Sequence, residues 1–227
     1  MTLRTPFPFA IVGFDLDGTL LDTSIDIGHA LNHTLRKVGR HMIPLTEMRR
    51  LIGGGTGQTL RAALDETGGA LPEDETLALQ DELYAYYEAH IAEHTMLYPG
   101  GEAMLDALAA RGVTLAVATN KREDLARLVF TELGLIDRFA AILGGDTLGP
   151  GRSKPAPDML RAMVEQAGGG AAAFVGDTTY DVGAARAAKL PVVAVSFGFH
   201  DLPPHDLGAD AVIDHFDELV PVLESLI

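Results

Sequence analysis

Apolar and polar positions along this chain follow two patterns: short apolar runs, and longer segments with apolar residues three or four positions apart. The runs predict buried strands and the longer segments predict amphipathic helices. Strands are predicted at 10–14, 113–119, 139–143, 172–175, 191–196 and 211–213. Helices are predicted at 101–111, 122–133, 157–166, 180–188 and 216–226. Because strands this apolar are buried on both faces, we expect a Rossmann-like α/β fold, a parallel sheet covered by helices.

One stretch, residues 21–96, departs from this alternation because it contains helical spacing only. Its helices are predicted at 24–38, 46–51, 57–67 and 74–94. Pro99 and Gly100 then mark a turn at which the α/β pattern resumes. We therefore predict two domains: an α/β core of residues 1–20 and 97–227, and an all-helical cap of residues 21–96 inserted into it.

The composition narrows the possible partners. The 227 residues carry a formal net charge of −15 and include no cysteine. Such an acidic chain disfavours nucleic acid and anionic membranes, which attract basic patches, and it cannot form disulfides or thiolate metal sites. No apolar run approaches the roughly 20 residues that cross a bilayer, and no secretory pattern is present. We expect a soluble, cytoplasmic monomer or homodimer without nucleic-acid or membrane partners.

Two carboxylates one residue apart, Asp15 and Asp17, follow the first apolar run. If the strand continued, both side chains would point the same way. Their charges would then repel by about 4 kcal/mol at about 4 Å and an effective dielectric constant of about 20. We therefore expect a cation between them or a proton on one of them. Either arrangement indicates chemistry rather than stability.

Polar groups also follow the other predicted strands. Thr119 and Asn120 end the second, Lys154 lies beyond a loop after the third, and Asp177 and Asp181 follow the fourth. Because ligands of open α/β sheets bind at the carboxyl ends of the strands, we expect these groups to converge. Carboxylates without histidine favour a hard cation, Mg²⁺ first. The set suits phosphoryl transfer, in which one carboxylate is the nucleophile and a second is the acid and base.

Four segments resemble the four motifs of the haloacid dehalogenase-like hydrolase superfamily, in the subgroup with a helical cap between the first two motifs. They read DLDGT at 15–19, TN at 119–120, KP at 154–155 and GDTTYD at 176–181. Within the superfamily, the segments TNK, GGDT and KPAPDML are most similar to phosphoglycolate phosphatases. The resemblance implies Mg²⁺-dependent hydrolysis of small phosphate monoesters, with 2-phosphoglycolate as the leading substrate.

The resemblance also implies a role for each matching residue. Asp15 would be the nucleophile and Asp17 the general acid and base, which favours phosphate over carbon–halogen substrates. Mg²⁺ would be held by the carboxylates of Asp15 and Asp177 and by the backbone carbonyl of Asp17, with Asp181 beside it or joined to it through water. The transferring phosphoryl group would be held by Gly18, Thr119, Asn120 and Lys154.

The cap is expected to close over the strand ends, which would exclude water and limit the ligand to a small phosphorylated metabolite. Residues 53–57, GGGTG, lack the lysine of a phosphate-binding loop and are predicted to form a flexible loop facing the site. A substrate carboxylate would suit a guanidinium. Arg50 is the predicted substrate-binding residue, with Arg49 and Arg61 as further candidates and ordinary exposed arginines as the alternative.

Other interpretations remain open at this stage. The same mechanism would serve a pyrophosphatase, a sugar-phosphate phosphatase or a phosphoglucomutase-like enzyme, and a non-catalytic member would bind a phosphometabolite. The sequence HIAEH at 90–94 has the spacing of a zinc-protease helix. An amphipathic helix with an exposed charged face explains it as well.

Overall fold

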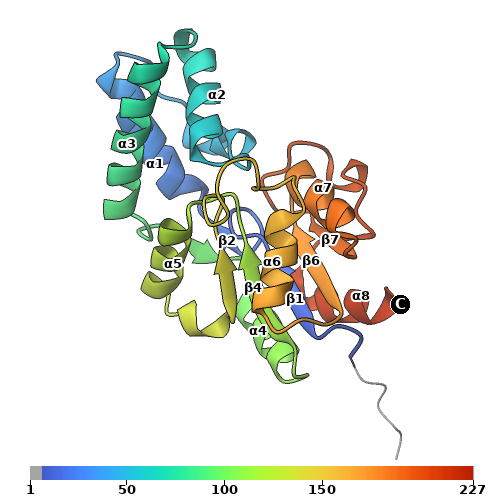
Figure 1. The fold of residues 1–227 in the computed structure, drawn as a ribbon. Helices are drawn as coiled ribbons and strands as arrows, with labels where there is room; N and C mark the ends of the chain where they lie inside the picture. Colours follow the sequence, from blue (N-terminus) through green and yellow to red (C-terminus); the bar gives the residue numbers. More distant parts are fainter. Residues whose placement is uncertain (1–6, 227) are drawn as a thin grey trace, which may run out of the picture.

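The computed structural model describes residues 7–226 and has a six-stranded sheet at its centre (Figure 1). Neighbouring strands are parallel, in the order β5-β4-β1-β6-β7-β8. The strands are β1 (Ile11–Phe14), β4 (Thr114–Ala118), β5 (Ala141–Leu143), β6 (Ala172–Gly176), β7 (Val192–Val195) and β8 (Ala211–Ile213). The predicted α/β class is confirmed.

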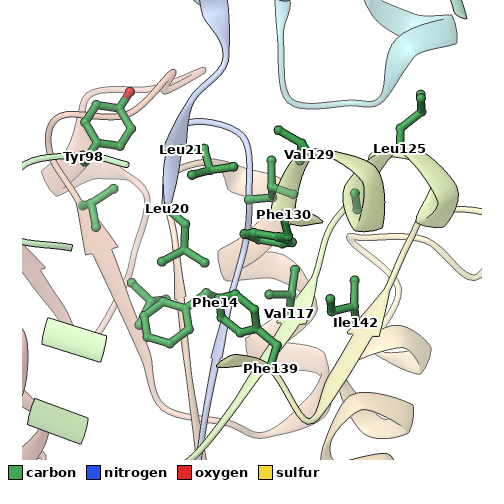
Figure 2. Close-up of a cluster of buried hydrophobic side chains, with 14 of the residues drawn as sticks. Phe14, Leu20, Leu21, Tyr98, Val117, Leu125, Val129, Phe130, Phe139 and Ile142 are labelled. Carbon is green, nitrogen blue, oxygen red and sulfur yellow. The ribbon is translucent and has the colours of Figure 1, made fainter. Parts of the chain in front are cut away.

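Helices cover both faces of the sheet, because side chains along each strand alternate between two apolar clusters. In β1, Val12 and Phe14 belong to one cluster and Ile11 to the other. The first cluster includes residues of α4 (Gly101–Ala109), α5 (Glu123–Glu132) and α8 (Leu219–Ser225). Residues of α6 (Asp158–Gln166) and α7 (Thr179–Ala188) belong to the second. Figure 2 shows part of the first, where the rings of Phe14, Phe130 and Phe139 gather beside Val117.

Short 3₁₀ segments complete this part of the chain: η2 (Ile136–Arg138), η3 (Pro204–Asp206) and η4 (Phe216–Glu218). The last of these corrects the prediction of one helix over 216–226, since the α-helical part begins only at Leu219. Pro221 explains the late start. Its ring would clash with the carbonyl four residues earlier, so proline is tolerated in a first helical turn but not deeper in a helix.

The segment predicted to form the cap, residues 21–96, lies between β1 and β4 in the chain and at one end of the sheet in space (Figure 1). It contains α1 (Ser24–Lys37), η1 (Leu45–Leu51), α2 (Thr56–Gly68) and α3 (Glu73–Ala89). At its ends, β2 (Leu21–Asp22) and β3 (Met96–Leu97) pair as an antiparallel ribbon. The sequence did not predict this ribbon, because two-residue strands are too short to show a period. None of the helices in residues 7–226 is long and apolar enough to span a bilayer.

A buried carboxylate, Asp26, joins the first cap helix to the segment that leaves the cap. Its oxygens accept hydrogen bonds from the backbone N–H groups of His94 and Thr95 and from the hydroxyl of Thr95, at 2.7–3.1 Å. Because the backbone of this segment turns to meet Asp26, α3 ends at Ala89 and not at residue 94 as predicted. His90 and His94 are therefore not on a helix, and His94 Nδ1 contacts Asp26 instead.

Replacement of Asp26 by alanine is expected to lower the free energy of unfolding by about 3 kcal/mol. The change leaves buried N–H and O–H donors of residues 94 and 95 without an acceptor, and hydrogen bonds to charged groups contribute about 1.5–3 kcal/mol each. Urea denaturation measures the loss. The exposed carboxylate of Asp81 on α3 supplies the control, since Asp81→Ala is expected to change stability by less than about 0.5 kcal/mol. Equal effects of the two substitutions would contradict this role.

Candidate active site

The chain leaves the sheet directly after Asp15. The backbone N–H of Asp15 still donates to the carbonyl of Val175 on β6, at 2.9 Å. The next residues form a tight loop in which the Leu16 carbonyl accepts from the backbone of residues 19, 20 and 21. Gly18 has φ of +84°, and a Cβ there would lie 2.2 Å from Asp177 Oδ2, so only glycine fits.

The sequence predicts a cation between Asp15 and Asp17 or a proton on one of them, and among the described residues no single lysine pairs with both. The strand does not continue, and each carboxylate meets its own lysine. Lys154 Nζ lies 2.7 Å from Asp15 Oδ1, while Lys121 Nζ donates to both oxygens of Asp17 at 2.9 Å. The two acids of the first motif therefore have different lysines as partners.

Asp15 is buried, with 6% of its surface exposed. Burial raises the pKa of Asp15 to about 7, and the ammonium group of Lys154 opposes that shift. Lys154 reaches over from the loop after β5 and also donates to Asp181 Oδ1 at 2.6 Å. The angle of its approach to Asp15 Oδ1 lies outside hydrogen-bond geometry, so this oxygen has an ionic neighbour and no hydrogen-bond donor among the described residues.

Three buried carboxylates, those of Asp15, Asp177 and Asp181, form an acidic cluster whose ligand atoms lie within 4.8 Å of one another. Burial, followed by repulsion from Asp181 and Asp15, raises the pKa of Asp177 well above its usual range. A cation bound here would relieve that repulsion and give Asp15 Oδ1 a partner. An all-oxygen donor set suits a hard divalent cation. The side-chain carboxylate of Asp17 lies outside this cluster, and the prediction for Asp17 concerned its backbone carbonyl.

The helix α7 positions one member of the cluster. Asp181 Oδ2 accepts from the backbone N–H and hydroxyl of Thr178 at 3.0 and 2.6 Å, which forms a capping box at the start of the helix. Its other oxygen, Oδ1, accepts from Lys154. Asp181 therefore both caps the helix and contributes to the cluster.

Asp177 is held from two sides. The hydroxyl of Thr19 donates to Oδ1 at 2.8 Å, and the backbone N–H of Phe199 donates to Oδ2 at 2.6 Å. A Cβ at Gly198 would lie 2.4 Å from Asp177 Cβ, so the loop that carries Phe199 approaches as closely as it does only with glycine there. No pattern in the sequence points to Phe199, because a backbone N–H carries no side-chain signature.

Among the predicted phosphoryl-binding residues, Thr119, Asn120 and Lys154 lie beside these carboxylates. The backbone N–H of Gly18 instead donates to the Leu21 carbonyl at 2.9 Å within the loop, which corrects the prediction for Gly18. Thr119 is buried, and its hydroxyl accepts from the backbone N–H of Lys121 at 3.2 Å. The Asn120 amide accepts from the Lys154 backbone N–H at 3.0 Å and donates to the Lys154 and Gly53 carbonyls at 3.2 and 3.3 Å. Asn120 thus fixes the loop that carries Lys154 and also contacts the cap.

Lys121 is a site residue that the sequence analysis did not predict. It is 5% exposed, and besides its bonds to Asp17 its ammonium group lies 4.7 Å from the centre of the Tyr87 ring. Thr23 completes the surroundings of Asp17 by donating to Oδ1 at 2.7 Å. The position of Lys121 directly after Thr119 and Asn120 was the available signal in the sequence. Only the fold shows that the Lys121 side chain turns inward.

A cavity of about 30 Å³ separates cap and core at this point. Its lining from the core consists of Asp15, Asp17 and Lys121. Its lining from the cap consists of Ile27, Ile52, Gly53, Gly55, Thr56, Thr59, Leu83 and Tyr87. Gly53, Gly55 and Thr56 of the predicted loop 53–57 face the site, but α2 begins at Thr56, so only residues 53–55 form a loop. A Cβ at Gly55 would lie only 3.1 Å from the Asn120 carbonyl oxygen.

The structure does not bring the three candidate arginines to this cavity. Arg50 forms ion pairs on the outside of the cap with Glu47, three residues earlier on η1, and with Glu66 on α2. Arg61 likewise pairs with Glu73, at 2.7 Å. Arg49 pairs with Asp22 and lies 5.8 Å from the centre of the Phe199 ring. All three side chains are about half exposed, at 46–48%.

Comparisons with known proteins agree with this geometry. The family model described as haloacid dehalogenase-like hydrolase matches residues 12–195. A phosphoglycolate phosphatase of Agrobacterium fabrum is 39% identical over 225 residues, covering 98% of this chain and 95% of the relative. One from Rhodospirillum rubrum is 41% identical over 221 residues, covering 93% and 89%. The crystal structure of a predicted phosphoglycolate phosphatase from Haemophilus somnus superposes with a TM-score of 0.87 at 29% identity, covering 95% of this chain and 98% of that one.

A parallel sheet, a helical cap inserted after its first strand and a carboxylate cluster at the strand ends define a capped hydrolase with a Rossmann-like core. The chain belongs to the haloacid dehalogenase-like hydrolase family. The family resemblance stated from the four motifs is confirmed.

Binding of Mg²⁺ to the acidic cluster is expected to raise the free energy of unfolding, by about 2.7 kcal/mol at 100 times the dissociation constant. Asp177→Asn removes one ligand charge and is expected to weaken the apparent affinity at least about tenfold. Thermal denaturation at increasing Mg²⁺ concentration measures both effects. The exposed Asp137 gives a matched control, Asp137→Asn, whose Mg²⁺ response should equal that of the wild type. An unchanged response in Asp177→Asn would place the cation elsewhere.

Proposed function

We propose that this protein is a Mg²⁺-dependent phosphatase that hydrolyses small phosphate monoesters through an aspartyl-phosphate at Asp15, with 2-phosphoglycolate as its leading substrate. The observation that carries the proposal is that the two acids of the first motif have different partners. Asp15 belongs to the acidic cluster beside Lys154, and Asp17 lies outside it, paired with Lys121 at the cavity. The relatives named phosphoglycolate phosphatase support the choice of substrate.

In the first step, a carboxylate oxygen of Asp15 attacks phosphorus, and the bond from phosphorus to the ester oxygen breaks. Asp17 in its protonated form gives its proton to that oxygen, so glycolate leaves as an alcohol. Lys154 and the backbone N–H groups after β1 and β4 neutralise charge on the phosphoryl oxygens. Lys154 contacts both Asp15 and Asp181 and is therefore already at the reacting group.

In the second step, Asp17 accepts a proton from water, and the water oxygen attacks phosphorus. The bond between phosphorus and Asp15 breaks, which releases inorganic phosphate, frees the carboxylate of Asp15 and leaves Asp17 protonated, as it was before the first step. One carboxyl group thus acts first as acid and then as base. The hydrogen bonds from Lys121 and Thr23 keep Asp17 directed toward the cavity in both steps.

The cation would be held by Asp15 and Asp177, with Asp181 beside it. Four carboxylates and two ammonium groups meet at this site, so an anionic phosphate would be repelled without further positive charge. Bound Mg²⁺ supplies that charge and orients the phosphoryl oxygens.

The cavity favours a small substrate. Ile27, Ile52 and Leu83 supply apolar walls to it. A hexose would place hydroxyl groups against these walls without hydrogen-bond partners, at a cost of about 1–3 kcal/mol each. These walls therefore favour a short acid over a sugar.

Cytoplasmic location and a monomeric or homodimeric state stay predictions.

Asp15→Asn is expected to abolish turnover, by at least about a thousandfold, because it removes the nucleophile and preserves the shape of the side chain. Phosphate release from 2-phosphoglycolate with Mg²⁺ measures the loss, and circular dichroism checks the fold. Asp137→Asn serves again as the surface control. Substantial residual activity in Asp15→Asn would exclude the covalent mechanism.

Asp17→Asn is expected to separate the two steps when p-nitrophenyl phosphate is the substrate. Its leaving group needs little protonation, so the aspartyl-phosphate still forms, whereas its hydrolysis lacks a base and slows at least about a hundredfold. Acid quenching would then trap a phosphorylated protein, with a burst of p-nitrophenol close to one equivalent. Turnover close to that of the wild type, with no trapped phosphorylated protein, would mean that Asp17 does not act in the second step.

The substrate choice is tested by phosphate release from 2-phosphoglycolate, pyrophosphate, hexose phosphates and nucleoside monophosphates, with and without Mg²⁺. We expect the highest kcat/KM for 2-phosphoglycolate. Preference for pyrophosphate or a hexose phosphate would transfer the mechanism to that substrate. Phosphoryl return to a sugar phosphate would indicate a mutase, and silence with measurable ligand binding would indicate a non-catalytic member.

A further inference from the structure

The proposed mechanism assigns no role to the hydroxyl of Tyr87, which lines the cavity. Tyr87, on α3, is 3% exposed and lines the cavity, and no described residue makes a hydrogen bond of good geometry with its hydroxyl. The ammonium group of Lys121 is the cation close enough to act on the pKa of this hydroxyl. A buried hydroxyl without a partner costs about 1–3 kcal/mol, which phenylalanine would avoid. Burial raises the pKa of Tyr87 to about 12, so the hydroxyl keeps its proton at neutral pH and can donate to an acceptor.

Lys121 has donor capacity left beside this hydroxyl. Its ammonium group has three N–H donors, and Asp17 accepts from it through two oxygens at 2.9 Å. Lys121 Nζ also lies 4.7 Å from the centre of the Tyr87 ring. Among the residues that line the cavity, Lys121 carries the positive charge.

The start of α2 adds further donors. Gly55 precedes the helix and has no side-chain oxygen to accept from its first N–H groups, and Gly55 and Thr56 both line the cavity. A helix of 13 residues presents free N–H groups and a partial positive charge at this end. Donors from core and cap thus face one space.

We propose that the ammonium group of Lys121, the hydroxyl of Tyr87 and the first turn of α2 bind the carboxylate of the substrate. This inference rests on the proposed function and names the residues that distinguish 2-phosphoglycolate from esters without an acid group. A carboxylate only accepts hydrogen bonds, so it fits a space lined by donors. The apolar walls of the cavity strengthen the attraction by excluding water.

This arrangement replaces the predicted role of Arg50. The three arginines near the cap loop are engaged by carboxylates outside the cavity, whereas Lys121 reaches it from the core. Because Lys121 also holds Asp17, a substrate that binds Lys121 places its ester oxygen next to the acid that protonates it. Recognition and proton transfer then share one lysine.

The test compares kcat/KM for 2-phosphoglycolate with kcat/KM for ethyl phosphate, which has a methyl group in place of the carboxylate. The wild type is expected to prefer 2-phosphoglycolate. Tyr87→Phe removes only the hydroxyl and should lower kcat/KM for 2-phosphoglycolate about tenfold while changing ethyl phosphate less than about twofold. Tyr86→Phe, on the same helix but stacked between His33 and His90, is the matched control and should leave the ratio unchanged.

Lys121→Met gives a second readout. It should slow both substrates, because Asp17 loses its partner, and it should reduce the preference for 2-phosphoglycolate by a further factor of about ten or more. A merely structural role for Lys121 would slow both substrates equally and leave the ratio intact.

Each outcome separates this inference from the proposed function. A wild type that prefers 2-phosphoglycolate, with the same ratio in Tyr87→Phe and Lys121→Met, would overturn the carboxylate site alone. A wild type that hydrolyses both esters equally would overturn the site together with the choice of substrate, and the phosphatase mechanism would stand. If neither ester is hydrolysed, the proposed function fails. Calorimetric affinities of 2-phosphoglycolate for the wild type and Tyr87→Phe then decide the inference, and equal affinities would overturn it.

Discussion

Two buried ammonium groups, those of Lys154 and Lys121, hold the site together. Isolated buried carboxylates cost several kcal/mol unless they are paired, and each acid of the first motif has its own lysine. The pairing is incomplete, because Asp177 lies against Asp15 and Asp181 without a lysine of its own. This excess of negative charge attracts a divalent cation to the cluster. Without a cation, the carboxylates of Asp15, Asp177 and Asp181 repel one another. The same feature that costs stability is the one that binds the metal.

A small number of polar contacts hold the cap against the core. Asn120 donates to the Gly53 carbonyl, and Gln58 donates to the hydroxyl of Tyr180 at 2.8 Å. The ring of Tyr84 lies under the guanidinium of Arg122, 4.5 Å from ring centre to guanidinium carbon. These contacts involve exposed or half-buried groups, which contribute little each. They can form and break with modest changes in free energy, as a lid over a reaction site requires.

The sequence predicted the core more completely than the cap. Strand β8 has the predicted bounds, and the other strands of the sheet lie within the predicted ranges or extend one residue past them, because parallel strands buried on both faces show continuous apolar runs. The end of α3 was predicted too late, since helical spacing continues to residue 94 while Asp26 draws the backbone away. The signal that ends this helix lies 68 residues earlier in the chain, so no local pattern reveals it.

The sequence by itself determined the fold class and the residues of the acidic cluster, because strand ends and their carboxylates are local features of the chain. Only the tertiary structure decided which lysine meets which acid. The loop at Gly18 brings Asp17 to Lys121 while Asp15 lies beside Lys154, which no spacing rule shows. It also decided that Arg50 lies outside the cavity and that Lys121 and Tyr87 line it. Partners of long charged side chains depend on distances between segments far apart in the chain, and those distances exist only once the chain has folded.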